Sequence, residues 1–166
     1  MQVNIALLTV TDTRTMDTDK SGGILVKKIK EQNHNLVARK IVKDEKNEIK
    51  KILLDWIKKK EIDVIITTGG TGLTGRDITP EALDEIADKH IPGFGEVFRT
   101  ISLKTVGTSS IQSRACAVLA NGKYIFALPG SSGGVTDAWD EILIHQLDIN
   151  HKPCNFVELF PRLKEK

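Results

Sequence analysis

The segment TTGGTGLTGRDITPEAL, residues 67–83, decides how this sequence is interpreted. It begins at the end of an apolar run, residues 62–68, that is typical of a strand buried on both faces. Residues 70–75 match the dinucleotide-binding pattern G-x-G-x-x-G and also the G-x-x-x-x-G of a P-loop. The segment is therefore a dinucleotide motif, an altered P-loop, or a third kind of phosphate-binding turn.

The residues that follow the glycines argue against the first two interpretations. A dinucleotide motif needs a helix that begins inside it and a further strand that ends in an acid about 20 residues on. Here the helix-start signal, Thr79-Pro80, comes later, and residues 91–96 do not resemble a strand. A P-loop needs Lys-Ser/Thr where this sequence has Arg76-Asp77. What remains is a glycine-rich turn that binds an anion through backbone N–H groups, with Arg76 adding charge and Asp77 available to Mg²⁺.

Working outward from this segment, apolar strand patterns alternate with amphipathic helix patterns. Strands are expected at residues 3–10, 36–42 and 62–68, and helices at residues 21–32, capped by Ser21, and 45–60. This β-α-β-α-β order with buried strands predicts a parallel sheet that has helices on both faces.

The second half of the chain adds helices and a hairpin. Thr79 is expected to cap a third helix, and further helices are expected at residues 94–102 and 134–147. Asn121-Gly122 separates two strand patterns, residues 116–120 and 123–128, and so predicts an antiparallel pair on an otherwise parallel sheet. The tail, residues 150–166, has no clear period and is expected to pack over the surface or against a neighbour.

Composition limits the class of protein. A length of 166 residues suggests one domain, residues 1–166, and 40% hydrophobic with 28% charged residues is ordinary for a soluble globular chain. A net charge of +2 gives no reason to expect nucleic acid or an anionic membrane as partner, and no run is long enough to span a bilayer. Cys116 and Cys154 lack zinc-ligand spacing. We therefore expect a protein of a reducing compartment, the cytoplasm.

The loops that follow the predicted strands contain the residues suited to chemistry. In an open α/β sheet, ligands bind beyond the carboxyl ends of the strands. Asp12, Asp44, the glycine turn and Ser131 all follow such ends, so we expect them to gather at one edge. These residues have ordinary alternatives: Asp12 as a loop acid, Asp44 as a helix N-cap, Asp77 as a turn former, Ser131 as part of a flexible helix start, and Ser109 and Ser110 as loop polarity.

The same residues carry a family resemblance. Residues 68–72 followed by 76–82 resemble the signature of the MoaB/MogA molybdopterin-binding family. Residues 11–15, 91–96, 108–115, 128–131 and 152–156 also resemble segments of its MoaB branch, so the resemblance covers essentially the whole chain. One departure is the last loop, Pro-Gly-Ser-Ser-Gly-Gly at residues 129–134, where many active relatives have a further proline or lysine.

The resemblance implies a three-layer α/β/α sandwich, assembly as trimers or hexamers, and a cytosolic role in molybdenum cofactor biosynthesis. It also implies molybdopterin adenylyltransferase activity, in which the terminal phosphate of molybdopterin attacks the α-phosphorus of Mg-ATP and pyrophosphate leaves. Asp44 and Asp77 correspond to the catalytic acids that hold Mg²⁺. The expected nucleotide- and pterin-binding residues are Asp12, Gly69, Gly70, Thr71, Gly72, Arg76, Ser109, Ser110 and Ser131.

Two other functions remain open. One is a non-catalytic molybdopterin-binding or assembly protein of the same pathway, which would bind the pterin without releasing pyrophosphate from Mg-ATP. The other is an NAD-type dehydrogenase based on G-x-G-x-x-G, which would bind a nicotinamide dinucleotide.

Overall fold

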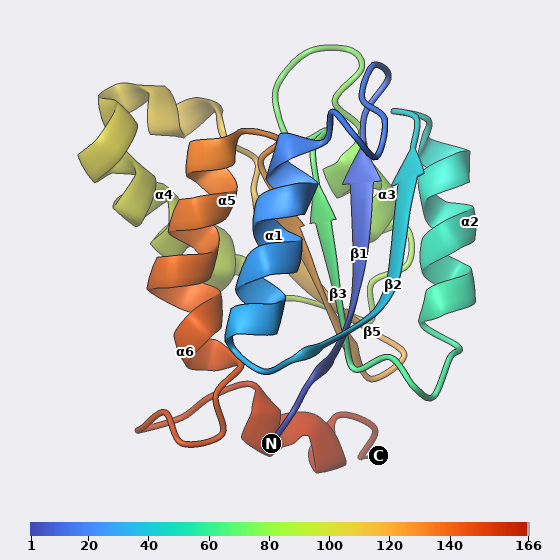
Figure 1. Ribbon diagram of the computed structural model, residues 1–166, viewed down its shortest axis with the longest axis vertical. Helices are drawn as coiled ribbons and strands as arrows, with labels where there is room; N and C mark the ends of the chain where they lie inside the picture. The colour runs from blue at the N-terminus through green and yellow to red at the C-terminus, as the bar shows by residue number, and fades with distance from the viewer. Residues whose placement is uncertain (166) are drawn as a thin grey trace.

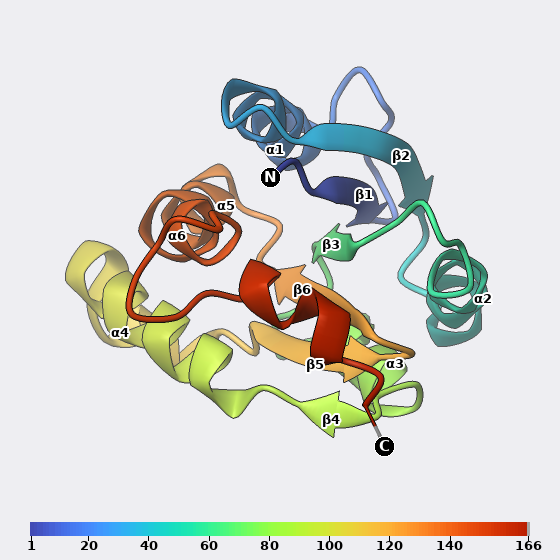
Figure 2. The same ribbon diagram turned by 90° about the horizontal axis from the view of Figure 1, so that it is seen from below.

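Within residues 1–165, the sheet has six strands in the order β2-β1-β3-β6-β5-β4. Figure 1 shows β2, β1 and β3 side by side, and Figure 2 labels every strand. In the computed structural model, which describes residues 1–165, the strands are β1 (Asn4–Val10), β2 (Asn35–Val42), β3 (Val64–Thr68), β4 (Lys89–His90), β5 (Cys116–Ala120) and β6 (Lys123–Leu128). β1 pairs in parallel with β2 and β3, and β3 with β6, whereas β5 is antiparallel to both β6 and β4. The predicted mostly parallel sheet with an antiparallel hairpin is confirmed.

Helices cover both faces of this sheet (Figure 2). One face carries α1 (Lys20–Glu31), α4 (Pro92–Val106) and a continuous helix made of α5 (Ser132–Ala138), the π-helical η2 (Trp139–Leu143) and α6 (Ile144–Gln146). The other carries α2 (Lys46–Trp56) and α3 (Thr79–Asp84). The predicted three-layer α/β/α sandwich is therefore confirmed. Among the residues described, no helix has the length and apolar character needed to cross a membrane.

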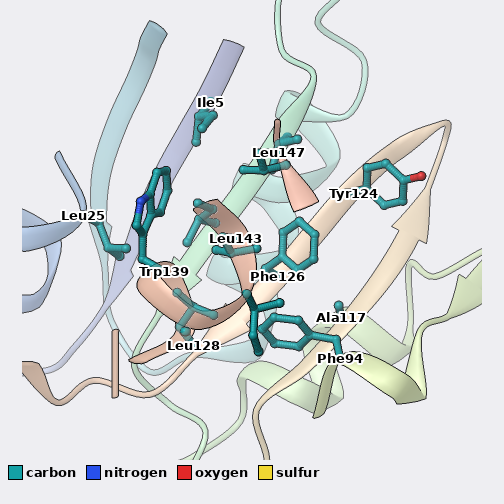
Figure 3. Packing of buried hydrophobic residues seen from close by; sticks show 14 of the residues in the cluster. Ile5, Leu25, Phe94, Ala117, Tyr124, Phe126, Leu128, Trp139, Leu143 and Leu147 are labelled. Carbon is teal, nitrogen blue, oxygen red and sulfur yellow. The ribbon is translucent and has the colours of Figure 1, made fainter. Parts of the chain in front are cut away.

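Alternate residues of the buried strands supply two separate cores. Leu7 of β1 faces the layer of α1, α4 and α5, and its neighbour Leu8 faces α2 and α3. In the first core, Trp139 and Phe126 are fully buried, and the ring of Phe126 lies 5.2 Å from that of Phe94 (Figure 3). Burying each such side chain contributes roughly 1.5–3 kcal/mol.

The C-terminal tail packs against its own chain. Its 3-10 helix η3 (Val157–Arg162) lies near the amino end of β6, where the ring of Tyr124 is 4.6 Å from Phe156 and 5.9 Å from Phe160. Of the two placements expected for residues 150–166, the structure supports packing over the chain's own surface. The last residue of this predicted tail, 166, lies outside the described residues. That residues 1–166 form a single domain stays a prediction.

The predicted caps of two helices are wrong, because an aspartate caps α1 and no side chain caps α3. Asp19 caps α1 by accepting a hydrogen bond from the N–H of Gly22 at 2.9 Å, and Ser21 lies inside the helix. A buried carboxylate is the stronger acceptor here. Thr79 is the first residue of α3, and its hydroxyl donates to the carbonyl of Gly69 at 2.9 Å. The Thr79 side chain therefore links α3 to the glycine turn instead of capping the helix.

Some predicted boundaries also shift. α2 ends at Trp56, because the chain then turns through a bond from Lys59 N–H to the Trp56 carbonyl at 3.1 Å. α4 extends beyond residues 94–102 in both directions. Its amino-terminal boundary was placed too late because Gly93, a residue of poor helix propensity, lies inside the helix. The short edge strand β4 was not predicted, because two exposed residues, Lys89 and His90, carry no alternation of polarity.

Neither cysteine forms a disulfide. Cys116 is partly buried at the start of β5, and burial raises the pKa of its thiol to about 11. Cys154 is exposed on the C-terminal tail.

Candidate active site

A cleft of about 750 Å³ opens beyond the carboxyl ends of β3 and β6. The glycine turn at residues 69–72 and Asp77 form one wall, α4 and the 3-10 helix η1 (Gly107–Gln112) form another, and the start of α5 closes the third side. The loops after β3 and β6 therefore meet at one edge, as the strand order predicts. The volume lies within the range of about 300–1,000 Å³ that is usual for small-molecule sites.

Backbone geometry explains the glycines of the turn. Gly69 has φ +101° and Gly70 has φ +67°, the left-handed region that favours glycine. A Cβ on Gly69 would lie 2.1 Å from the Val10 carbonyl oxygen, and one on Gly70 would lie 2.4 Å from Thr79 Oγ1. Because α3 begins only at Thr79, the turn lacks the helix that a dinucleotide motif places inside the glycines. The turn is thus not a dinucleotide motif, and anion binding through its backbone N–H groups stays a prediction.

Asp77 lines the cleft and is oriented by Thr74. Its Oδ2 accepts hydrogen bonds from the backbone N–H of Thr74 at 2.9 Å and from the Thr74 hydroxyl at 2.8 Å. Burial raises the pKa of Asp77, but these hydrogen bonds outweigh it and hold the pKa below its usual value. A Cβ on Gly72 would lie 2.7 Å from Asp77 Oδ2, so this glycine makes room for the carboxylate. Asp77 is thus a turn former and also a charged group in the cleft wall.

Asp44 lies behind the glycine turn, outside the lining of the cleft itself. A Cβ on Gly70 would be 3.0 Å from Asp44 Oδ1, so the carboxylate touches the turn. Burial, followed by the negative charges of Asp12 and Asp77, raises the pKa of Asp44. The N-cap of α2 is Glu45, so the alternative of Asp44 as that cap is wrong. Within residues 1–165, no side chain donates a hydrogen bond to the Asp44 carboxylate.

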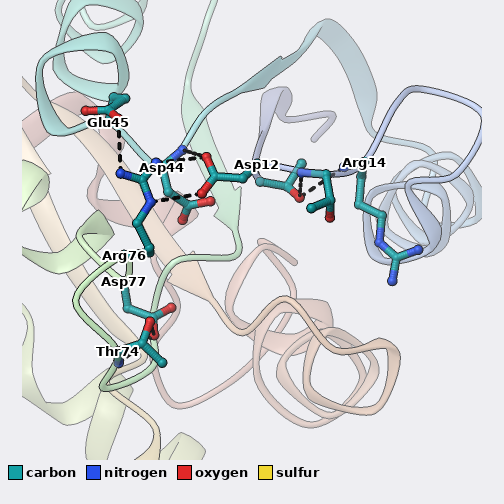
Figure 4. Close-up of polar contacts among 9 residues, drawn as sticks. Asp12, Arg14, Asp44, Glu45, Thr74, Arg76 and Asp77 are labelled. Carbon is teal, nitrogen blue, oxygen red and sulfur yellow. Dashed lines mark hydrogen bonds and ion pairs between the residues drawn. The ribbon is translucent and has the colours of Figure 1, made fainter.

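Arg76 and Asp12 form a rim beside the cleft. Nε and Nη2 of Arg76 donate to the two carboxylate oxygens of Asp12, each at 3.0 Å, and Nη1 donates to Glu45 at 3.1 Å (Figure 4). The hydrogen bond from Arg76 holds the pKa of Asp12 below its usual value. Asp12 also accepts from the N–H of Asp44 at 3.2 Å. The rim therefore ties together the loops after β1, β2 and β3, with the charge of Arg76 already balanced.

The predicted serines line the cleft from two other elements, η1 and the start of α5. Ser109 is exposed and Ser110 is buried, and both line the cleft from η1, which sequence reasoning treated as a loop. Ser131 caps α5, with its Oγ accepting from the Gly134 N–H at 3.1 Å, so its hydroxyl proton stays available to a ligand. The structure thus brings these serines to the same cavity as Asp77.

Sequence reasoning missed three polar residues of this region. Thr105 of α4 donates to Asp137 of α5 at 3.1 Å, and both line the cleft. Arg114 donates to the carbonyl of Gly72 at 2.7 Å and to that of Asp77 at 2.8 Å. Because these contacts join separate elements, no local pattern indicates them; the nearest signal was the polar run before β5, which includes Arg114.

The acidic side chains near the glycine turn decide whether this site could hold a metal ion. Within residues 1–165, His, Cys, Asp and Glu side chains form no group of three that could hold a metal ion. Mg²⁺, however, commonly binds one or two carboxylates together with substrate phosphates and water. Asp44 lies beside Gly70 and Asp77 beside Gly72 of the same turn; burial, and then the negative charges of Asp12 and Asp77, raise the pKa of Asp44, and a cation would offset this repulsion. The two acids therefore fit a metal that arrives with a phosphate ligand.

Fold and site together define an α/β protein with a cleft, lined by a glycine turn and an aspartate, beyond the carboxyl ends of a mostly parallel sheet.

Comparison with known proteins gives the family. Residues 6–149 match the family model described as "Probable molybdopterin binding domain". Molybdenum cofactor biosynthesis protein B of Escherichia coli is 44% identical over 161 residues, which cover 97% of this chain and 93% of that protein. The protein of the same name from Bacillus cereus is 43% identical over 147 residues, 88% of this chain and 87% of that one.

Solved structures agree. A crystal structure of molybdenum cofactor biosynthesis protein B has a TM-score of 0.89 and 38% identity, covering 100% of this chain and 98% of that one. MoaB of Pyrococcus furiosus, described as a tungsten cofactor synthesizing protein, has a TM-score of 0.76 and 35% identity, covering 86% and 91%. The chain belongs to the MoaB/MogA family of molybdenum cofactor biosynthesis proteins.

Proposed function

We propose that this protein binds molybdopterin and adenylylates its terminal phosphate with Mg-ATP. The observation that carries the proposal is the placement of Asp77, ionised and oriented by Thr74, in the wall of a cleft that the glycine turn also lines. Asp44 lies against the other side of the same turn.

The proposed reaction forms one P–O bond and breaks another. An oxygen of the terminal molybdopterin phosphate attacks the α-phosphorus of ATP, the bond from that phosphorus to the β-phosphate oxygen breaks, and pyrophosphate leaves. Such transfers depend on positioning and on neutralising charge more than on a covalent nucleophile. Backbone N–H groups of the glycine turn would bind the nucleotide phosphates.

Asp44 and Asp77 would hold Mg²⁺, which when bound neutralises charge on the phosphates. Ser109, Ser110 and Ser131, which also line the cleft, would contact the pterin or its phosphate. For Arg76 to bind a phosphate directly, it would have to leave Asp12, so its present role is to fix the rim.

The test is pyrophosphate release by the purified protein with molybdopterin and Mg-ATP, compared with reactions that lack either substrate or contain a chelator. We expect release that requires both substrates and Mg²⁺. Tight pterin binding without release would instead support the non-catalytic pterin-binding protein. Binding of a nicotinamide dinucleotide in place of ATP would support the dehydrogenase.

We further propose self-association as trimers or hexamers. Val97, Leu103 and Val106 of α4 and Ile111 of η1 are at least half exposed, which favours a surface that a second copy covers. Light scattering coupled to size-exclusion chromatography tests this, and a monomer at every concentration would contradict it. Cytoplasmic localisation stays a prediction.

A further inference from the structure

Arg114 connects the segment after η1 to the loop that carries Asp77. Its backbone N–H donates to the Thr71 carbonyl at 2.9 Å. Its side chain donates from Nε to the Gly72 carbonyl at 2.7 Å and from Nη2 to the Asp77 carbonyl at 2.8 Å, and Nη1 pairs with Glu81. Each nitrogen of the guanidinium is thus bonded to the glycine turn, to Asp77 or to α3.

The two carbonyls that Arg114 holds are the two ends of an exposed loop. Residues 73–76 between them are all exposed. Inside the loop, Thr74 orients the carboxylate of Asp77, and the Asp77 N–H donates to the Thr74 carbonyl at 3.0 Å. One planar guanidinium that binds both ends fixes their separation, because its donors have a rigid fork geometry. Arg114 therefore places the main chain of Asp77, whereas Thr74 orients its side chain.

Arg114 also relates the two walls of the cleft. Ser109 and Ser110 lie on η1, shortly before Arg114 in the chain, while its bonds reach the wall formed by the glycine turn and Asp77. The ion pair with Glu81 is partly exposed, with 30% of the Arg114 side chain accessible, and pairs of this kind contribute little to stability. The bonds to main-chain carbonyls are therefore the distinctive feature of this arginine.

We propose that Arg114 is a positioning residue of this site, which acts through Asp77 and the glycine turn to hold them in the arrangement that binds nucleotide phosphates. The identity of the ligand rests on the function proposed above. A lysine at this position keeps the charge but cannot bind both carbonyls with a fixed geometry.

The experiment compares Arg114→Lys with two controls. Arg99→Lys is the matched control, since Arg99 also donates to main-chain carbonyls, those of Ser113 and Ala115, but lies away from the cleft. Glu81→Gln weakens the ion pair and leaves the carbonyl bonds of Arg114 in place. Pyrophosphate release, amide hydrogen exchange and calorimetric binding of Mg-ATP are measured for each variant and the wild type.

For Arg114→Lys we expect kcat to fall about 10–100-fold with KM for ATP within about threefold, because misplacement of an acting group costs rate more than binding. Amide exchange should accelerate at residues 72–77 and not elsewhere. Both controls should stay within about twofold of wild type in kcat.

Equal losses in Arg114→Lys and Arg99→Lys, or faster exchange spread over the whole chain, would overturn the proposal in favour of a purely structural arginine. A wild type that releases no pyrophosphate would reject the proposed function, and the positioning role would then be decided by amide exchange. Faster exchange confined to residues 72–77 in Arg114→Lys supports it, and unchanged exchange overturns it.

Discussion

The two ends of the same sheet are built in opposite ways. At the amino end of β6, Tyr124 packs among the aromatic rings of Phe156 and Phe160, and the Lys123 ammonium donates to the carbonyl of Ile62, just before β3. At the carboxyl end of β3 lie glycines with positive φ and Asp44, whose pKa is raised by burial and by neighbouring acids. The aromatic packing that stabilises the fold is thus separated from the glycine turn and like charges of the candidate site.

The largest expected effect is at the amino end. Tyr124→Ala should lower the free energy of unfolding by about 3–5 kcal/mol, because it leaves a cavity among buried rings. For a chain of this length, the melting temperature should fall by about 6–20 °C. Pyrophosphate release by the folded variant at low temperature should stay near wild type; a site that fails while the fold persists would contradict the separation.

Asp77→Asn should have the reverse effect of Tyr124→Ala, a loss of activity with little change in stability. Removing the charge should reduce pyrophosphate release at least about 100-fold, roughly 2.7 kcal/mol in activation free energy. Asparagine can still accept from Thr74, so thermal unfolding should change little. The matched control is Asp55→Asn, an exposed acid on α2. Wild-type turnover in Asp77→Asn would remove Asp77 from the catalytic role.

Gly70→Ala should affect both properties. Positive φ and the approach to Thr79 Oγ1 should destabilise the protein by about 1–3 kcal/mol and lower nucleotide binding. Gly23→Ala is the control, because Gly23 lies in α1 with no atom within 4 Å of an added Cβ, and it should be neutral or slightly stabilising. Both variants are compared by urea unfolding and by calorimetry with Mg-ATP. Equal behaviour of the two would mean that the turn is not conformationally restricted.

The smallest effect expected is a gain of stability from Asp44→Asn. Since the folded state raises the pKa of Asp44, this carboxyl contributes stability that is fully present below its unfolded pKa, about 3.9, and is lost as pH rises through the folded value. The neutral asparagine should therefore raise the melting temperature at pH 7 by about 1–2 °C, and the gain should shrink as pH falls toward 4. Thermal unfolding from pH 4 to 8 measures this. A gain that grows at low pH would contradict the raised pKa.

The sequence predicted the features that depend on the order of strands and helices along the chain and on the periodicity of apolar residues. The β-α alternation placed Asp44, the glycine turn and Ser131 beyond the ends of strands, and the rule for open sheets then collected them at one edge. The turn also failed as a dinucleotide motif for the reason visible in the sequence, its late helix start at Thr79.

Contacts between elements were not predictable in this way. Arg114 binds carbonyl oxygens, which every residue carries, so its partners Gly72 and Asp77 leave no trace in the pattern of side chains. The Thr105–Asp137 contact joins two helices whose facing sides are set only when α4 and α5 pack together. Asp19, and not Ser21, caps α1. The sequence did not indicate this because the Asp19 carboxylate is held by Thr9 of β1, which is a tertiary contact.

The two cysteines differ enough in thiol reactivity for one of them to be labelled selectively. With its pKa near 11, Cys116 holds very little thiolate at neutral pH, whereas Cys154 is exposed on the tail that covers the amino end of the sheet. A thiol-reactive dye at neutral pH should therefore attach mainly to Cys154, on the side of the molecule opposite the cleft. Fluorescence anisotropy or surface immobilisation through that single position would then leave the mouth of the cleft unobstructed for ligand titrations.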